Sequence, residues 1–527
     1  MKIFIVNGQG GRGKALCNST ALPTPTGKRK VGEIKVGDYL FDRHGKPTKV
    51  LGVFPQGEKE VYEISFKDGR KAKCSKDHLW NIHKQSWHGE RSKNKFIPYT
   101  LKQIEEEGIK ISERQGYRFS IQCADPVIYP KKKNEIHPYV MGAFLGDGCC
   151  LERILTISSA DVEIVEKIND LIGGAGYRKL SDKNFSWIFF DSSNDKKRKN
   201  IKYFQTEAFF SKYKKEICQY SYNKRIPEDY KYTDLNSRIS LIQGLFDTDG
   251  SIDKKGNISF TSTSYQLILD VKEVLGSLGY VSSIYEDKRN KYTQKCYSLH
   301  VFMNNKEKIK LFSLSRKKEI ASKLPPSNFS YNSTKITQIK DLGYKEEMTC
   351  FLVDNDEHLF LMNDFIVTHN TTFEKIVKSY AWDTFFKEIT IASIIDPIKE
   401  VAKRIGWDGA KGNKDRAFLH ALKTLLHNYN HYDMNYIENK IHCAAALERT
   451  AIFIDMREKK DIEYLKSLYP EAKTVLVKRG KPISYGNAAD DNIMNIDYDI
   501  IIDNSGTLDD LKKAAIDFYN KEISDDI

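Results

Sequence analysis

A phosphate-binding loop that stops one residue before its end constrains this chain more than any other feature. Residues 1–7 read as a buried strand, and the run Gly8-Gln9-Gly10-Gly11-Arg12-Gly13-Lys14 follows it. The run fits the pattern G-x-x-x-x-G-K-[ST] up to its last position, where Ala15 replaces Ser or Thr. Thr371, 356 residues later, opens an amphipathic pattern that no strand precedes. Joining Lys14 to Thr371 restores strand, loop and helix, so we infer that residues 15–370 interrupt one domain.

The joined ends, called the host here, are 14 and 157 residues long. In the completed loop, backbone N–H groups between Gly8 and Gly13 would cradle phosphate, Lys14 would reach the terminal phosphates, and the Thr371 hydroxyl would bind Mg²⁺. ATP and Mg²⁺ are therefore the expected cofactors of the ligated host, with nucleotides as its partners. Apolar strands alternate with amphipathic helices after the loop and predict a parallel α/β sheet; they are Ile389–Ile395, Ala451–Asp455, Thr474–Val477 and Tyr498–Ile502.

The 171-residue host resembles the small P-loop kinases of the deoxynucleoside and nucleoside monophosphate type, with the phosphate loop as the specific part of the match. Asp396 and three arginines, Arg416, Arg457 and Arg479, could serve a nucleotide substrate. A surface role stands open for each arginine.

The C-terminal edge of the insert carries chemistry that breaks a peptide bond without an external nucleophile. The carboxamide nitrogen of Asn370 can attack its own carbonyl and close a succinimide. The adjacent imidazole of His369 can protonate the leaving amine and polarise the carbonyl. Elsewhere a His-Asn pair is an ordinary surface dipeptide, but here it stands at the break in the loop.

Both ends of the insert resemble inteins, whose splicing domains have the all-β Hint fold. Residues 15–125 and 332–370 are similar to its two halves, and short β-rich runs such as Val61–Phe66 agree with that fold. Most inteins begin with a nucleophilic Cys or Ser, whereas this insert begins with Ala15. Cys17 is an alternative first residue, but Ala15-Leu16 would then remain in the host and destroy the phosphate loop.

An intein without a first nucleophile resembles the class 3 inteins, which are marked by a Trp, a Cys and a following Thr. Trp80, Cys350 and Thr371 match these positions. The resemblance implies that Cys350 attacks the Lys14 carbonyl while His78 helps to expel the Ala15 amine. The acyl group then passes to Thr371, Asn370 cyclises, and an acyl shift forms the Lys14–Thr371 amide.

The other residues of this match have supporting roles. Trp80 is expected to pack and to position Cys350, although a lone cysteine such as Cys350 is ordinarily a buried core thiol. Ser75 stands where the family has Thr, three residues before His78. No cofactor is expected for splicing.

Residues 126–331 contain one pattern twice, Val140-Met141-Gly142-Ala143-Phe144-Leu145-Gly146-Asp147-Gly148 and Ile242-Gln243-Gly244-Leu245-Phe246-Asp247-Thr248-Asp249-Gly250. Gly142 and Gly244 would let two helices pack closely and bring Asp147 and Asp249 together. Two close carboxylates favour a divalent cation, as phosphodiester cleavage requires. The segments resemble LAGLIDADG homing endonucleases, which implies Mg²⁺ at these two acids and double-stranded DNA as partner. Two ordinary core helices with Asp caps are the alternative.

Charge supports a nucleic-acid partner for the middle of the chain only. The net charge is +13, and residues 126–330 hold 34 basic against 24 acidic side chains. A solvated Lys-rich surface would also explain this surplus, whereas clustered cations that contact phosphate would give salt-dependent DNA affinity.

No stretch approaches the roughly 20 apolar residues of a membrane span. The nine scattered cysteines suit reduced thiols, so we expect a cytoplasmic protein with neither disulfides nor structural zinc. The fold class is therefore multidomain: a split α/β P-loop host (1–14 and 371–527), the Hint halves (15–125 and 332–370) and an α+β endonuclease (126–331). A stable P-loop kinase with a non-splicing DNA-binding insertion is the alternative, and a splicing-dead relic is a third reading.

Overall fold

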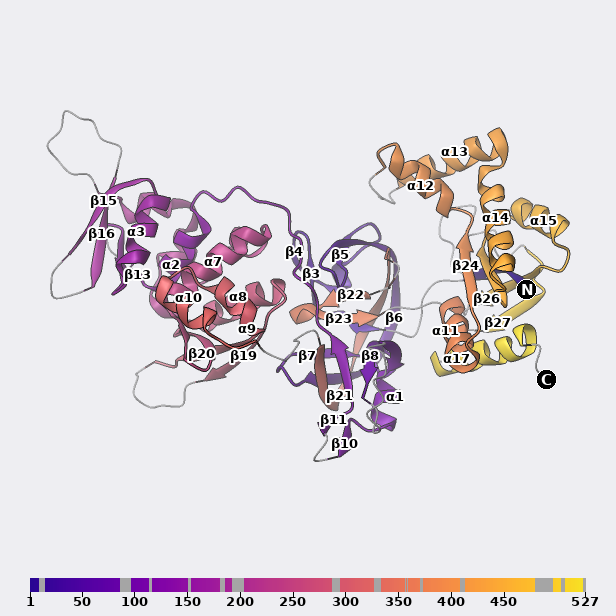
Figure 1. The fold of residues 1–527 in the computed structure, drawn as a ribbon, viewed down its shortest axis with the longest axis horizontal. Coiled ribbons are helices and arrows are strands. Elements are labelled where there is room, and N and C mark those ends of the chain that lie inside the picture. The colour runs from indigo at the N-terminus through magenta and orange to yellow at the C-terminus, as the bar shows by residue number, and fades with distance from the viewer. Residues whose placement is uncertain are drawn as a thin grey trace.

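The chain forms three domains that follow one another along the long axis (Figure 1). We call residues 15–125 and 333–369 the β-domain, residues 126–326 the central domain, and residues 1–8 with 373–524 the flanking domain. The β-domain lies in the middle, and both chain ends lie in the flanking domain (Figure 1). The computed structural model describes residues 1–8, 15–85, 96–112, 116–149, 153–180, 185–191, 203–286, 294–326, 333–355, 357, 359–369, 373–407, 413–478, 496–503 and 508–524.

The β-domain is built on one eight-stranded sheet with the order β5-β6-β7-β2-β21-β12-β8-β9. Two long strands, β6 (Pro47–Phe66) and β21 (Ser333–Val353), pair antiparallel and bend at register shifts, as bulged strands do. The other members are β2 (Leu16–Cys17), β5 (Tyr39–Phe41), β7 (Lys71–Cys74), β8 (Leu79–Lys84), β9 (Ile97–Thr100) and β12 (Phe119–Gln122).

Short hairpins complete the β-domain. β3 (Ala21–Thr24) pairs with β4 (Gly27–Lys30), β10 (Lys110–Ser112) with β11 (Gly116–Tyr117), and β22 (Leu359–Met362) with β23 (Ile366–His369). One helix, α1 (Leu101–Glu106), departs from the all-β expectation. Thr100 and Gln103 form a capping box at its N-terminus, which is a sequence signature of helix entry.

The central domain repeats one unit twice. The first repeat runs α2 (Pro138–Gly146), β13 (Gly148–Cys149), β14 (Thr156–Ser158), α3 (Val162–Leu171), β15 (Gly174–Lys179) and β16 (Ser186–Asp191). The second runs α7 (Leu235–Thr248), β17 (Gly250–Ile252), β18 (Ile258–Ser262), α8 (Tyr265–Ser277), β19 (Val281–Glu286) and β20 (Tyr297–Phe302). The sheets have matching orders, β13-β14-β16-β15 and β17-β18-β20-β19. α7 extends further back along the chain than the nine-residue motif because Asp234 caps it by accepting from two backbone amides.

Short helices link the two repeats and close the central domain. They are α4 (Thr206–Phe209), α5 (Lys214–Ile217), α6 (Glu228–Lys231), α9 (Asn305–Lys308) and α10 (Ser315–Ser322).

The flanking domain is a parallel sheet with the order β24-β25-β1-β26-β27. β1 (Lys2–Gly8) lies at the centre, and its apolar run Ile3–Val6 is buried throughout, as expected of a strand covered on both faces. The other strands are β24 (Ile389–Ser393), β25 (Ala451–Asp455), β26 (Lys473–Lys478) and β27 (Ile500–Asp503), and every bound lies within two residues of the predicted one.

Helices cover both faces of this sheet: α11 (Phe373–Phe385), α12 (Asp396–Arg404), α13 (Asn413–Asn430), α14 (Tyr432–Ala446), α15 (Lys459–Leu468) and α17 (Leu508–Phe518). Among the helices of the described ranges, none is both long and apolar enough to cross a membrane.

Candidate splicing junctions and endonuclease site

The first residues of the insert pair with the strand that carries the candidate nucleophile. β2 and β21 are antiparallel, with Leu16 opposite Thr349 and Cys17 opposite Met348. This register, continued by one residue, places Ala15 opposite Cys350. Ala15 is fully buried and Cys350 is 5% exposed. The Cys350 thiol is therefore on the strand that flanks the start of the insert.

Cys17, the alternative first residue, has an environment that suppresses thiolate chemistry. Its side chain is fully buried in a small apolar cluster with Ala15, Val61 and Met348. Burial, and next the nearby charge of Glu346, raises the pKa of Cys17 to about 12. Burial likewise raises the pKa of Cys74. A thiolate is the reactive form of cysteine, so neither buried thiol suits a nucleophile.

The block from Ser75 to Trp80 touches both ends of the insert. The backbone amide of Ser75 donates to the Ala15 carbonyl at 3.1 Å, and the His78 amide donates to Ser75. The His78 ring hydrogen-bonds through Nε2 to Thr368 Oγ1 on β23. Trp80 is fully buried, with its ring centroid 5.4 Å from that of His78 in an edge arrangement. Trp80 therefore packs directly against His78 and helps to fix its ring.

The C-terminal edge of the insert is described up to His369. That residue ends β23, opposite Leu359 of β22, and is 9% exposed. Gly8 ends β1 on the other side of the break. Gly13, Lys14, Asn370 and Thr371 lie outside the described residues, so their predicted roles stay predictions.

The two repeated motifs of the central domain pack as the glycine positions predicted. A Cβ atom added at Gly142 would lie 2.1 Å from the Leu241 carbonyl oxygen, and one at Gly244 would lie 2.1 Å from the Tyr139 carbonyl oxygen. Backbone therefore meets backbone at both glycines. Asp147 and Asp249 follow the last residues of α2 and α7 as their C-caps.

Asp147 and Asp249 interact electrostatically. Burial, and next the charge of Asp147, raises the pKa of Asp249 to about 7. Burial also raises the pKa of Asp147. Helix C-termini carry partial negative charge, so two carboxylates held at such ends are unfavourable without a cation.

Two buried lysines flank these carboxylates in equivalent places. Lys224 Nζ donates to the carbonyls of Phe144, Leu145, Gly146 and Gly148 at 2.8–3.3 Å. Lys317 Nζ donates to those of Phe246, Asp247 and Gly250 at 2.6–2.8 Å. Burial, and next the charge of Arg316, lowers the pKa of Lys317 to about 8. Each motif helix thus ends on one carboxylate and one ammonium group.

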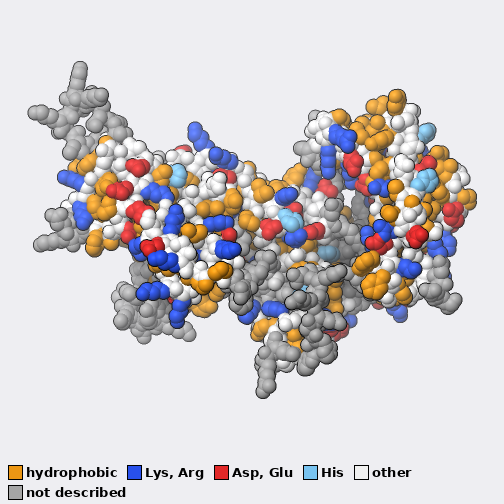
Figure 2. Space-filling view, in the orientation of Figure 1, with side chains coloured by type: hydrophobic (Ala, Val, Ile, Leu, Met, Phe, Trp, Pro, Cys, Tyr) orange, Lys and Arg blue, Asp and Glu red, His pale blue; other side chains and the backbone are white. Residues whose placement is uncertain are grey.

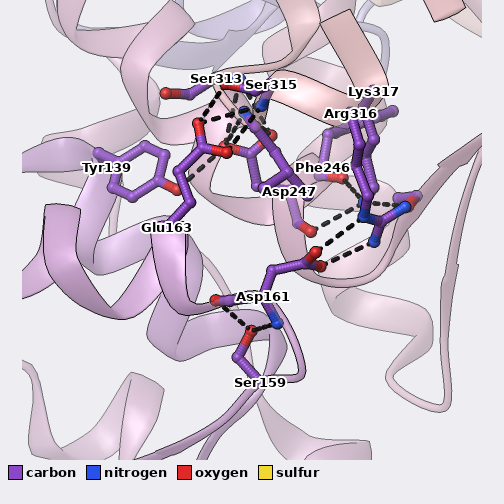
Figure 3. Close-up of polar contacts among 12 residues, drawn as sticks. Tyr139, Ser159, Asp161, Glu163, Phe246, Asp247, Ser313, Ser315, Arg316 and Lys317 are labelled. Atoms are coloured by element: carbon purple, nitrogen blue, oxygen red, sulfur yellow. Dashed lines mark hydrogen bonds and ion pairs between the residues drawn. The ribbon is translucent and has the colours of Figure 1, made fainter. Parts of the chain in front are cut away.

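A further carboxylate, Asp247, ties the second motif to the segment before Lys317. Its oxygens accept from the amides of Ser313 and Leu314 at 2.9–3.2 Å and from the Tyr139 hydroxyl at 2.9 Å (Figure 3). Residues of the first repeat hold the same segment: Glu163 accepts from the Ser315 amide and hydroxyl, and Asp161 forms a bidentate pair with Arg316 at 2.8 Å (Figure 3). Both repeats therefore position Lys317.

The second four-stranded sheet alternates apolar and polar side chains along β18 and β20. In the second sheet Ile258, Phe260, Leu299 and Val301 are buried. Its polar and aromatic side chains that are at least partly exposed are Ser251, Ser259, Thr261, Tyr285 and His300. Ser251 and Ser259 share a hydrogen bond of 2.8 Å. Lys and Arg side chains are spread over the visible face of the central domain, with acidic ones among them (Figure 2).

Comparison with known proteins gives a family match in the central domain. Residues 236–314, which span nearly all of the second repeat and the segment after it, match the family model of the LAGLIDADG-like domain. The second repeat is therefore similar to the LAGLIDADG-like domain family. A replicative DNA helicase DnaB from Mycobacterium intracellulare is 27% identical over 389 residues, which are 70% of this chain and 60% of that protein. The ribonucleoside-diphosphate reductase NrdEB subunit alpha of Bacillus subtilis (strain 168) is 24% identical over 261 residues, 46% of this chain and 22% of that one.

Solved structures show local likeness. The MchDnaB-1 intein is 38% identical over 13% of this chain and 53% of its own, with a TM-score of 0.13. The homing endonuclease I-DmoI in complex with DNA and Ca is 14% identical over 35% of this chain and 95% of its own, with a TM-score of 0.24. The chain thus spans 60% and 22% of the length of the two curated relatives above.

Sequence reasoning did not find several residues of these sites. Thr368 and Lys317 lie in none of the motifs above. Lys224 lies in Lys224-Arg225-Ile226-Pro227, a run that resembles the stretch before the second motif in LAGLIDADG endonucleases, but that resemblance gave the lysine no role. The two lysines follow Asp147 and Asp249 by 77 and 68 residues, so no constant spacing links them. Both lysines stand beside other basic residues, Arg225 in one case and Arg316 and Lys318 in the other, so no local signal singles them out.

Proposed function

We propose that the chain is a precursor that splices itself, with residues 15–370 leaving and Lys14 becoming joined to Thr371. The observation that carries this proposal is the pairing of Leu16 with Thr349, which, continued by one residue, sets Ala15 opposite Cys350. The hydrogen bond between His78 and Thr368 supports it, since it brings the N-terminal block against the strand that leads to Asn370.

The proposed splicing reaction has four steps. The Cys350 sulfur bonds to the Lys14 carbonyl carbon, the Lys14–Ala15 bond breaks, and the Ala15 amine takes a proton with the help of His78. The Thr371 oxygen then takes the acyl group and Cys350 regains its thiol. The side-chain carboxamide nitrogen of Asn370 then bonds to the backbone carbonyl carbon of the same residue and forms a succinimide. This breaks the Asn370–Thr371 bond and frees the Thr371 amine. That amine attacks the ester and forms the Lys14–Thr371 amide.

Intact mass after expression tests this proposal. Wild type should give a 171-residue host and a free 356-residue insert. Cys350→Ala and Asn370→Ala should each lose ligation, and Cys17→Ala should keep it because the Cys17 thiol is buried with a pKa of about 12. Splicing by Cys350→Ala together with its loss in Cys17→Ala would overturn both the boundary and the nucleophile.

We propose that the central domain cleaves double-stranded DNA at the site where the insert is absent from the host gene. Asp147 and Asp249 are the candidate Mg²⁺ ligands. They fit a divalent cation because they are mostly buried, repel each other and stand at two helix C-termini. In the described part of the chain, no group of three or more His, Cys, Asp or Glu side chains is arranged to hold a metal, so water and DNA phosphate would complete the coordination. A bound Mg²⁺ would stabilise charge on the reacting phosphate.

The residues around the two carboxylates have distinct tasks in this proposal. Lys224 and Lys317 balance the carboxylates and present positive charge toward a phosphate. The exposed polar face of the second sheet, with Ser251, Thr261 and His300, supports readout of base edges in the major groove. Arg178 on β15 and other exposed cations would contact phosphates and give salt-dependent affinity.

Cleavage of a DNA that carries the joined host coding sequence tests the endonuclease. Wild type with Mg²⁺ should cut it once, and Asp147→Asn and Asp249→Asn should bind it but not cut it. Cutting that persists in both variants would overturn the assignment of the two acids.

We propose that the ligated host is an ATP-dependent nucleotide kinase. The parallel sheet supports this, because β1 lies at the point where the strand order reverses and its C-terminal end, Gly8, leads into the loop. Asp396 begins α12 beyond β24 and accepts from the Ser393 amide, and Arg457 lies just beyond β25 within 3.5 Å of Asp455. These side chains gather at the same edge of the sheet. The side chain of Arg416, and all of Arg479, lie outside the described residues.

A replicative-helicase type of ATPase is the second candidate for the host, because two curated relatives are named DnaB. Phosphate transfer from ATP to nucleoside and deoxynucleoside monophosphates by the spliced 171-residue product would support a kinase. ATP hydrolysis that depends on single-stranded DNA, without such transfer, would support the helicase type instead. Another relative is named as a reductase subunit, which agrees with an insert that occurs in unrelated host proteins.

A further inference from the structure

The turn between β22 and β23 has a conformation that its side chains do not favour. Asp364 and Phe365 both lie in the left-handed region, with φ of 53° and 56°. Residues with a Cβ atom seldom adopt this region, and such a turn persists only where its surroundings hold it. The turn sets the register of β22 against β23, in which Leu359 stands opposite His369. A slip of one residue would turn His369 to the other face of the hairpin.

Arg70 is the residue that holds this turn from within the β-domain. Its Nη1 lies 3.3 Å from the Asp364 carbonyl oxygen and 3.5 Å from that of Phe365. The rest of the guanidinium donates to Asp68 at 2.8 and 3.1 Å and contacts the Cys123 sulfur at 3.5 Å. Arg70 is 6% exposed. A buried cation that bonds a fixed carboxylate on one side and two carbonyls on the other is a rigid support.

The central domain also contacts this turn. Gly276 on α8 faces Phe365 so closely that an added Cβ atom would lie 2.9 Å from the ring. Lys272, also on α8, lies 3.8 Å from the Asp364 carboxylate. Ser283 on β19 donates to the Asp68 carbonyl at 2.8 Å. Two elements of the central domain thus contact the turn and the partner of Arg70.

We propose that Arg70 is a positioning residue for the C-terminal step of splicing, and that helix α8 of the endonuclease domain completes its support. Both hold the Asp364–Phe365 turn in the conformation that presents His369 to Asn370. Neither group contacts the reacting atoms. The inference rests on the splicing function proposed above and adds that the endonuclease domain contributes to one half of the splicing reaction.

Two backgrounds of the full-length chain separate the half-reactions. In Cys350→Ala, release of residues 371–527 reports cyclisation of Asn370. In Asn370→Ala, release of residues 1–14 by an added thiol reports the thioester at Lys14. Arg70→Met should slow the first release about tenfold or more, since small misplacements of a catalytic group cost that much or more. It should leave the second within about twofold.

The matched control is Arg29→Met. Arg29 also pairs with an aspartate, Asp38, at 2.8 Å and donates to a carbonyl of the β-domain, that of Glu33, so both releases should stay within about twofold. Gly276→Ala supplies a second variant from the central domain and should slow only the release of residues 371–527. Equal slowing of both releases by Arg70→Met and Gly276→Ala, or no slowing by either, would overturn the proposal. Absence of both releases in the two background proteins would overturn the splicing function itself.

Discussion

The Nε2 atom of His78 and the Oγ1 atom of Thr368 share a buried hydrogen bond that joins two segments 290 residues apart. His78 belongs to the block whose Ser75 amide binds the Ala15 carbonyl, and Thr368 precedes His369. The two edges of the insert therefore meet through one pair of side chains.

Thr368→Val removes this hydrogen bond with little change in volume. We expect cleavage at Lys14 to slow about tenfold, because His78 loses the partner that orients its ring for proton transfer. Thiol-induced release of residues 1–14 from the Asn370→Ala protein measures it. Thr337→Val is the matched control, since the Thr337 hydroxyl donates to a backbone carbonyl on the long strands, that of Ser65. Equal rates in Thr368→Val and in Thr337→Val would contradict this role.

Thiol labelling should separate the cysteines by their surroundings. Cys443 is exposed, whereas Cys17 and Cys74 are buried. At pH 8 a thiol of pKa about 12, as burial gives Cys17, is ionised in roughly one molecule in 10⁴. Iodoacetamide followed by peptide mass spectrometry should modify Cys443 first and leave Cys17 and Cys74 unmodified until the chain is denatured. Modification of Cys17 as fast as Cys443 would show that the Cys17 thiol is accessible to the reagent and not buried.

The features that the sequence could predict depend on local pattern. The motif glycines Gly142 and Gly244 predicted two closely packed helices because only glycine allows such an approach, and the structure has that packing. The flanking strands were predictable from apolar runs, and four of them lie close to their expected bounds. The ends of the insert, inferred from the interrupted phosphate loop, stay a prediction because residues 9–14 and 370–372 lie outside the described ranges.

The features that the sequence could not predict depend on pairings between distant segments. The register of Leu16 against Thr349 and the contact of Arg70 with the Asp364 carbonyl join residues about 300 positions apart. No short-range pattern encodes them. Left-handed φ at Asp364 and Phe365 was equally hidden, because such turns usually carry Gly or Asn. The closing contacts at Lys14, Asn370 and Thr371 lie outside the described residues and stay predictions.

Binding of Mg²⁺ by the central domain should depend on pH near neutrality. Burial, and next the charge of Asp147, raises the pKa of Asp249 to about 7, so below that pH a proton competes with the cation. We expect Mg²⁺ affinity to fall nearly tenfold for each pH unit below 7 and to level off above 8. Calorimetric titration of the full chain from pH 5.5 to 8.5 measures it. Asp253→Asn, at an exposed turn where the carboxylate accepts from Asn257, should leave the curve unchanged. If the Mg²⁺ affinity stayed the same from pH 5.5 to 8.5, the proposed competition between the proton and Mg²⁺ would be contradicted.

The same pKa makes a prediction for stability without metal. Because the folded-state pKa of Asp249 is about 7 and its ordinary value is 3.8, the folded chain holds an extra proton between these values. Stability from this group is therefore present at low pH and is lost as pH rises through 7, at about 1.4 kcal/mol for each pH unit between the two pKa values. Asp249→Asn removes the titration. It should raise the melting temperature of the central domain by several degrees at pH 8 in EDTA and change it little at pH 4. An equal change in melting temperature at pH 8 and pH 4 would mean that burial and repulsion from Asp147 do not destabilise the ionised Asp249. The two carboxylates would then have no electrostatic repulsion for a bound cation to relieve.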